Sequence, residues 1–226
     1  MKKIVLLFSV FFILKFHIKA QDSLSFKEFR LGFGLSDAGI NLYNKVGSEF
    51  NIQQKGSINL LTSASAGFNI KKFAFELGID KGGQTNYMDS NLYTIGMTVS
   101  NLRLNFKYSL FNNWQNQINI LSELGAQSIE FNIDSSSGTT KLFDLTSTVI
   151  EKDLIMAGIG IEYIYKLKIK NNRAFVYGTR VGYNLYIQEN HWSKGYHVKY
   201  SPSGFKNNVT GNFYGTIFLG YRLYKM

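Results

Sequence analysis

Hydrophobic and polar residues alternate with a period of two along most of the chain. In residues 27–36, for example, Phe29, Leu31 and Phe33 are separated by charged residues or glycine. Period two places successive side chains on opposite faces of an extended strand, so it predicts strands and not helices. The alternation predicts eight strands, over residues 27–36, 58–68, 73–80, 93–110, 118–127, 155–165, 175–185 and 213–223.

The fourth predicted strand changes phase once. Its apolar positions run to Val99 and resume at Leu102, with Ser100 and Asn101 between them. One extra residue in a strand moves every later side chain to the other face. We therefore expect a β-bulge at Ser100–Asn101.

The connections between the predicted strands alternate in length. Short turns are expected at residues 69–72, 111–114 and 167–173, and long polar loops at 37–56, 81–92, 132–152 and 188–208. Outer-membrane barrels combine short periplasmic turns with long extracellular loops, and an even strand count leaves both chain ends on the short-turn side. The pattern predicts an all-β fold, an eight-stranded antiparallel up-and-down transmembrane β-barrel.

The two faces of these strands leave two architectures open. If the apolar face points inward, the chain is a secreted lipocalin-like calyx that binds a small apolar ligand. If it points outward, the chain is a membrane barrel with a polar lumen. The polar face is rich in glycine and has few charges, and tyrosines lie near strand ends, as in the aromatic girdles of membrane barrels. These features favour the membrane barrel; the tyrosines are Tyr93, Tyr108, Tyr163, Tyr165, Tyr183, Tyr221 and Tyr224.

Charged residues on the polar face are expected inside the barrel. Eight strands enclose an interior that side chains nearly fill, so an open pore is not expected. A charge left unpaired there is costly, so we expect a network of ion pairs in the lumen. Its candidates are Glu28, Arg30, Glu76, Arg103, Lys107, Glu123, Glu162, Arg180 and Arg222. The pairing depends on strand register, and any one of them could instead lie at a water-filled end without a partner.

Residues 1–20 have the pattern of a signal peptide. Lys2 and Lys3 precede an apolar run, Ile4–Leu14, which is too short to span a bilayer as a helix, and Ala20 is a plausible cleavage point. The alternative is a short uncleaved anchor. Cleavage would leave residues 21–226 as the barrel domain and lower the formal net charge from +10 to +6. The remaining basic residues are scattered on an exported chain, so no nucleic-acid partner is expected.

The composition excludes several other classes of protein. The chain has no Cys, which excludes a disulfide framework, a thiolate metal site, a Cys nucleophile and an acylated anchor. A hydrophobic content of 45% with 15% aromatic residues argues against a disordered chain. A mean hydropathy of -0.09 argues against a helical membrane protein.

The leader, Gln21 at the expected mature start, the eight strands and the closing segment Gly220-Tyr221-Arg222-Leu223-Tyr224 resemble a known group. They are similar to the small outer-membrane β-barrel proteins of Gram-negative bacteria, which include the OmpA transmembrane domain and the PorT-like barrels. The resemblance implies an outer-membrane location, with membrane lipid, lipopolysaccharide and the barrel assembly machinery as partners. It also implies a non-enzymatic role in envelope integrity, surface interaction or secretion assistance.

The last long loop has the remaining candidate chemistry. His191-Trp192-Ser193 resembles the His/Ser pair of the lipid A deacylase barrels, so a lipid-modifying barrel enzyme is an alternative hypothesis. No Asp or Glu follows Glu189 to orient the base, so we predict no catalysis, and neither a metal site nor a cofactor. Cations and aromatics of this loop could contact lipopolysaccharide or an envelope protein. The candidate contact residues are His191, Trp192, Lys194, Tyr196, Lys199 and Tyr200.

Overall fold

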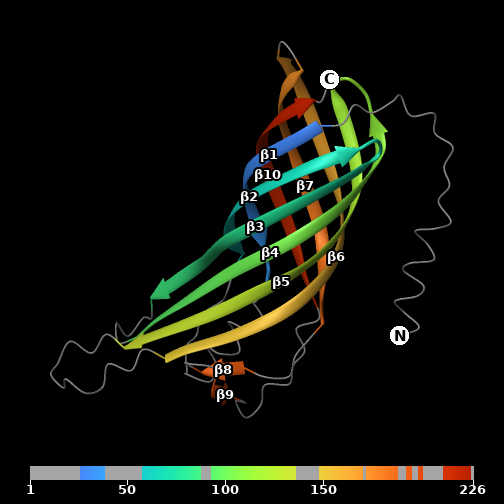
Figure 1. The fold of residues 1–226 in the computed structure, drawn as a ribbon. Helices are drawn as coiled ribbons and strands as arrows, with labels where there is room; N and C mark the ends of the chain where they lie inside the picture. The colour runs from blue at the N-terminus through green and yellow to red at the C-terminus, as the bar shows by residue number, and fades with distance from the viewer. Residues whose placement is uncertain are drawn as a thin grey trace.

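Eight long strands form one closed antiparallel barrel in the computed structural model of the chain (Figure 1). Residues 26–38, 58–87, 93–135, 148–169, 172–187, 192–194, 198–200 and 211–224 are described. The strands are β1 (Phe26–Ser36), β2 (Asn59–Ile70), β3 (Phe73–Tyr87), β4 (Tyr93–Asn112), β5 (Asn116–Ser135), β6 (Thr148–Ile169), β7 (Arg173–Ile187), β8 (Trp192–Lys194), β9 (Val198–Tyr200) and β10 (Gly211–Tyr224).

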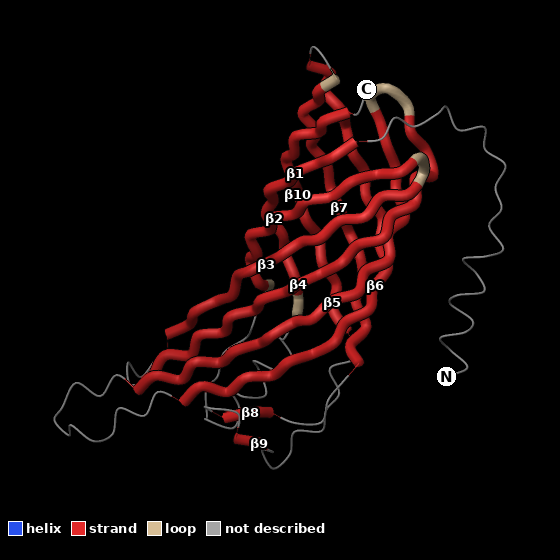
Figure 2. Tube along the Cα trace, viewed as in Figure 1, coloured by secondary structure: helices blue, strands red, loops and turns tan. Residues whose placement is uncertain are grey.

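Each of the strands β1 to β6 pairs with the next one along the chain. Strand β10 pairs with both β7 and β1, which closes the ring, while β8 and β9 lie outside it as a short hairpin on the edge of β6. The prediction of an eight-stranded antiparallel up-and-down barrel is confirmed. The described part of the chain contains no helix, and therefore none long and apolar enough to cross a membrane (Figure 2).

The short turns gather at the end of the barrel where β10 ends (Figure 1). Ile70 pairs with Phe73, which leaves Lys71 and Lys72 as a two-residue hairpin turn, with Lys71 at φ 56°. Asn172, before β7, has φ 58°, a conformation that Asn tolerates better than most residues, and its carbonyl accepts a hydrogen bond from the Tyr224 amide at 2.8 Å. The left-handed residues thus fit tight connections at this end.

Burial alternates along the strands as the hydrophobic pattern does. On β1, Phe29, Leu31 and Phe33 are more than half exposed, whereas Glu28 and Arg30 are buried. Over this part of the barrel the apolar side chains therefore form a belt on the outside, and charged side chains such as Glu28 and Arg30 lie in the lumen. A calyx would bury the apolar face instead.

The expected β-bulge at Ser100–Asn101 is wrong. Strand β4 pairs with both neighbours without a shift through these residues, and its one register shift lies between Ser109 and Phe111. Met97 and Val99 are instead buried on the inner face, whereas Leu102 is exposed on the outer face. The phase of the strand is constant; the face that is apolar changes.

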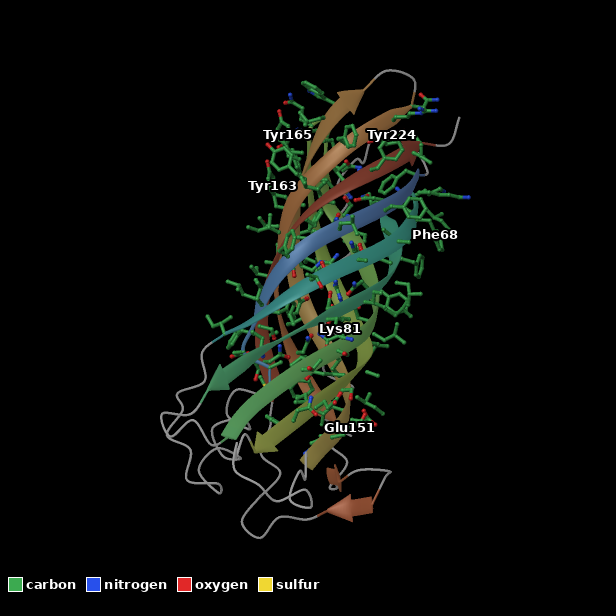
Figure 3. The ribbon with its side chains drawn as sticks, turned by 90° about the vertical axis from the view of Figure 1, so that its left-hand side faces the viewer. Phe68, Lys81, Glu151, Tyr163, Tyr165 and Tyr224 are labelled. Carbon is green, nitrogen blue, oxygen red and sulfur yellow. The ribbon has the colours of Figure 1, made fainter. Side chains whose placement is uncertain are left out.

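The neighbouring strands change in the same row. Residues that pair side by side across neighbouring strands are here called a rung. The last outward apolar rung crosses four strands and consists of Ile79, Leu102, Ala126 and Ile155. The next outward rung on these strands is polar and consists of Lys81, Ser100, Ser128 and Asp153. Figure 3 labels Lys81 and Glu151 below the middle of the barrel, far from the tyrosines of the short-turn end. The outward apolar belt therefore ends between these two rungs.

Beyond the belt, β3 to β6 continue as a sheet with a polar outer face and an apolar inner face, here called the extension (Figures 1 and 2). The predicted long loops at 81–92 and 132–152 are wrong for this reason, since the connections there are only residues 88–92 and 136–147. Lys152 is buried on the inner face, and this burial lowers the pKa of its ammonium. The apolar side chains on the inner face of the extension are Met97, Val99, Ile129, Phe131, Leu154 and Met156.

The substitution Phe131→Ala should lower the free energy of unfolding by about 3–5 kcal/mol, because the ring is completely buried in the extension. Asn132→Ala, on the outer face of the same strand, is the matched control and should change it by less than about 0.5 kcal/mol. Urea unfolding of the folded barrel measures both values. A larger loss for Asn132→Ala would mean that β5 has the opposite phase here.

Candidate functional site: a charge network in the lumen

The nine charged residues predicted for the lumen are all buried there, with exposed fractions between 0% and 7%. Alternation along each strand turns them inward. They come from seven strands: Glu28 and Arg30 from β1, Glu76 from β3, Arg103 and Lys107 from β4, Glu123 from β5, Glu162 from β6, Arg180 from β7 and Arg222 from β10.

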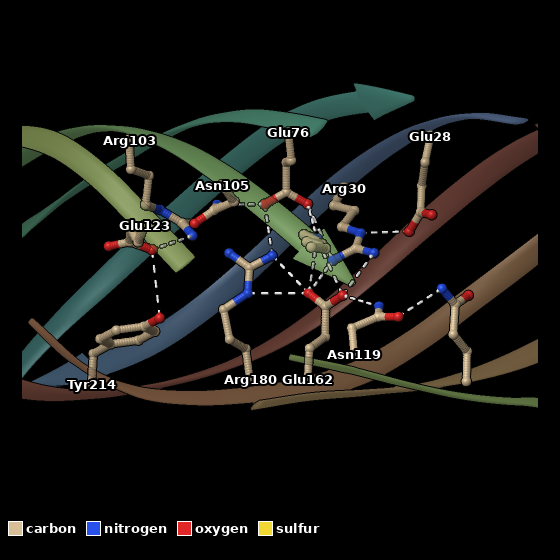
Figure 4. Close-up of polar contacts among 12 residues, drawn as sticks. Glu28, Arg30, Glu76, Arg103, Asn105, Asn119, Glu123, Glu162, Arg180 and Tyr214 are labelled. Atoms are coloured by element: carbon tan, nitrogen blue, oxygen red, sulfur yellow. Dashed lines mark hydrogen bonds and ion pairs between the residues drawn. The ribbon is translucent and has the colours of Figure 1, made fainter. Parts of the chain in front are cut away.

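Two carboxylates form the centre of this network (Figure 4). Glu162, which has no exposed surface, accepts hydrogen bonds from Lys107 Nζ at 3.0 Å and from Arg180 Nη2 at 2.7 Å, and it also pairs with Arg30. Glu76 pairs with the same three cations, with Lys107 Nζ and Arg180 Nη2 each at 2.6 Å and Arg30 Nη1 at 3.2 Å. Three cations thus share two carboxylates.

Register and closure both contribute to this centre. Arg180 lies directly opposite Glu162 on the neighbouring strand, and so does Asn119, whose Nδ2 donates to Glu162 Oε1 at 2.9 Å. Arg30 and Lys107 reach Glu162 across the lumen from β1 and β4. Side chains from opposite walls therefore meet, as the narrow interior of an eight-stranded barrel allows, and they close the lumen at this level.

Two smaller groups flank the centre. Towards the extension, Arg103 makes a bidentate pair with Asp80, at 2.7 and 2.8 Å, and lies 3.7 Å from Glu123, which accepts a hydrogen bond from the Tyr214 hydroxyl at 3.4 Å. Bidentate arginine–carboxylate pairs are among the stronger and more directional polar contacts. This group continues the polar lumen beyond the centre.

Towards the short turns, Arg222 donates to Glu28 Oε2 at 2.8 Å and to Gln117 Oε1 at 2.9 Å, and its guanidinium lies 3.7 Å from the centre of the Phe26 ring. Arg30 also donates to Glu28, so this group is joined to the centre. In total five cations pair with five carboxylates, the carboxylates being Glu28, Glu76, Asp80, Glu123 and Glu162. The network is therefore neutral.

Comparison with known proteins gives a likeness of fold. No protein-family model and no curated protein matches the sequence. The crystal structure of a major outer membrane protein from Thermus thermophilus has a TM-score of 0.54 and 10% identity, over 87% of this chain and 99% of that one. That of Ail, the attachment invasion locus protein of Yersinia pestis, has a TM-score of 0.50 and 11% identity, over 89% of this chain and 100% of that one. The chain has the fold of the small eight-stranded outer-membrane β-barrels.

Glycines adapt this small outer-membrane barrel fold to large inward side chains. A Cβ on Gly178 would lie 2.7 Å from the Phe218 ring, and one on Gly160 would lie 3.0 Å from Leu121 Cδ1. Phe218 in turn lies under the guanidinium of Arg30, which is 4.3 Å from the ring centre. The glycines of the polar face thus leave room for the groups that hold the network in place.

The nine lumen candidates predicted from the sequence do not include every member of the network. Asp80 lies in phase with Glu76 on β3, so complete reading of that face would have included it. Tyr214 likewise lies in phase with Asn212 on β10. The amides Asn105 and Asn119 had no distinguishing signal, because their role depends on Glu76 and Glu162 being near them.

The predicted contact loop is only partly described. His191 and Tyr196 lie outside the described residues; Trp192 and Lys194 belong to β8, and Lys199 and Tyr200 to β9. Strand β8 pairs with Ile150 and Glu151 of β6, so this hairpin adds to the edge of the extension. Among the described residues no group of three or more His, Cys, Asp or Glu side chains could hold a metal ion.

Glu162→Gln should lower the free energy of unfolding of the small barrel by about 3–5 kcal/mol, because it leaves buried cations without enough negative charge. Asp153→Asn, on the exposed outer face of the same strand, should change it by less than about 0.5 kcal/mol. Urea unfolding in lipid vesicles gives both values.

Combining Glu162→Gln with Lys107→Met should recover part of this loss, because the double variant restores neutrality. The coupling free energy from the double-mutant cycle should fall between about 0.5 and 3 kcal/mol. Purely additive losses would contradict the shared network.

Proposed function

We propose that the protein is a non-enzymatic integral protein of the bacterial outer membrane, inserted as a multi-pass β-barrel after cleavage of residues 1–20. The observation that carries this proposal is the apolar belt around a lumen filled with paired charges. Inside a bilayer every backbone polar group needs a partner within the protein, which a closed ring of strands supplies. A membrane-spanning strand needs about 9–11 residues, and β1 has 11.

The closed lumen supports a role other than passage of solutes. Arg30, Glu76, Lys107, Glu162 and Arg180 meet across the interior, so a solute would have to break buried ion pairs to pass. We therefore infer that the barrel acts through the surfaces it presents, in surface interaction or envelope integrity. Outer-membrane lipid, lipopolysaccharide and the barrel assembly machinery are the partners that this role implies.

The extension supports surface interaction as the more specific role. It projects past the apolar belt with a polar outer face, on the side of the long connections (Figure 1). Ser193 lies there too, paired with Glu151, beyond the belt that would contact acyl chains. This position favours a display role over lipid modification. Assistance of secretion and the likeness to PorT-like barrels stay predictions.

Cell fractionation and gel mobility test the membrane proposal. The protein should be recovered in the outer-membrane fraction, and the folded barrel should migrate faster on a denaturing gel when unheated than after boiling, because a closed barrel resists unfolding by detergent. Protein found in the soluble periplasm, with no mobility shift, would contradict it.

A liposome-swelling assay tests the closed lumen. Vesicles that contain the barrel should swell in isotonic arabinose no faster than empty vesicles, because the ion network blocks the interior. A general porin in parallel vesicles is the positive control. Rapid swelling with the barrel would show that the network opens and that the protein conducts.

A further inference from the structure

The outer surface of the barrel is asymmetric in charge from end to end. At the short-turn end, Lys27, Lys71 and Arg173 are exposed. Every carboxylate outside the lumen network whose side chain the structure describes lies at the opposite end: Asp37, Glu130, Glu151 and Asp153. The short-turn end is thus cationic on its outer surface over the part of the chain that the structure describes.

Two of these cations lie in one rung across three strands. Leu223 of β10 pairs with Lys27 of β1 on one side and with Arg173 of β7 on the other. All three face outward. Paired strands are about 4.8 Å apart, so the backbones of the two cations are separated by about 10 Å. Their long flexible side chains can converge on one anionic group above Leu223.

No described residue forms an ion pair with Lys27 or Arg173. Lys27 also pairs across strands with Phe68 on its other side, so its outward neighbours in the rung are apolar. The carboxylate of Glu28, next to it in sequence, points into the lumen and is engaged by Arg222. The two outward cations are therefore available to a ligand.

The rungs that follow become progressively less polar. The next consists of Phe29, Tyr221 and Phe175, with the last two rings 5.5 Å apart in an edge-to-face contact. The one after it consists of Leu31, Leu219 and Tyr177. Over three rungs the surface thus changes from cationic to aromatic to largely aliphatic, which parallels a phospholipid from phosphate to glycerol region to acyl chain.

We propose that the outer face of β1, β10 and β7 binds one anionic phospholipid, with its phosphate between Lys27 and Arg173 and its acyl chains along the Phe29 and Leu31 rungs. The proposal rests on the proposed membrane function, because that function places the short-turn end in the periplasmic leaflet, where the anionic lipids are phospholipids. A lipid whose headgroup carries its own ammonium has no net charge, so the same two cations attract it less strongly than they attract an anionic lipid. The site therefore selects phosphatidylglycerol over phosphatidylethanolamine.

Native mass spectrometry of the barrel, extracted from phosphatidylcholine vesicles and titrated with either lipid, tests the proposal. One phosphatidylglycerol should bind in clear preference to phosphatidylethanolamine. A cation near an anionic headgroup contributes roughly a fivefold preference, so Lys27→Gln with Arg173→Gln should weaken phosphatidylglycerol binding by about tenfold or more. The control Lys71→Asn with Lys72→Gln removes the same charge at the same end, away from the rung, and should keep the preference.

Equal binding of the two lipids, or equal losses in the two double variants, would overturn the site and leave only diffuse attraction. The unheated gel band of the same vesicles reports membrane insertion separately. A normal mobility shift without lipid preference would refute the site alone. Absence of the shift in every variant and in the unaltered protein would refute the membrane function, and the lipid site with it.

Discussion

Neutralisation of charge inside a narrow barrel is the constraint on which the rest of this structure depends. Glu162 is completely buried, and it stays ionised at acceptable cost only because cations from three other strands surround it. Those contacts join β6 to β1 and β4, which the ladder of backbone hydrogen bonds connects to it only through the strands between them. A buried network in which every carboxylate is paired with a cation favours one arrangement of the walls. It also occupies the space through which a solute would pass.

The apolar outer surface of the barrel is the counterpart of its charged lumen, because inward and outward positions alternate along each strand. Within the belt the charged side chains turn inward, and the alternate positions have apolar residues such as Leu31 and Leu219, which are about 70% exposed. In water such a belt would be a large unfavourable surface, whereas in lipid it is the favourable one. The end of the belt at the Lys81–Asp153 rung therefore marks a change of medium, and beyond it the preference of the two faces is reversed. The extension is a sheet of the kind found in soluble proteins, continuous with membrane strands.

The two ends of the barrel differ for related reasons. Tight turns at one end place Lys71 and Asn172 in left-handed backbone, and this end also contains the outward cations Lys27 and Arg173. The other end has the outward carboxylates and the extension. The outer surfaces of the two ends therefore differ in the sign of their charge. The lipid site depends on the membrane proposal, because Lys27 and Arg173 can bind an anionic phospholipid only if the short-turn end lies in the leaflet that contains it.

Period-two alternation was enough to predict the eight strands of the barrel and their up-and-down order. It also placed nine charged residues in the lumen, because the face of a residue such as Glu162 follows directly from its position in the strand. It was not enough at Ser100 and Asn101, where a swap of the apolar face imitates a bulge. Alternation reports which side chains share a face, but not which medium that face meets, and only the neighbouring strands reveal that Met97 faces a core. The sequence also could not predict that Arg30 pairs with Glu162, which lies 132 residues away. Such contacts depend on closure of the ring, which brings opposite walls together whatever their separation in sequence.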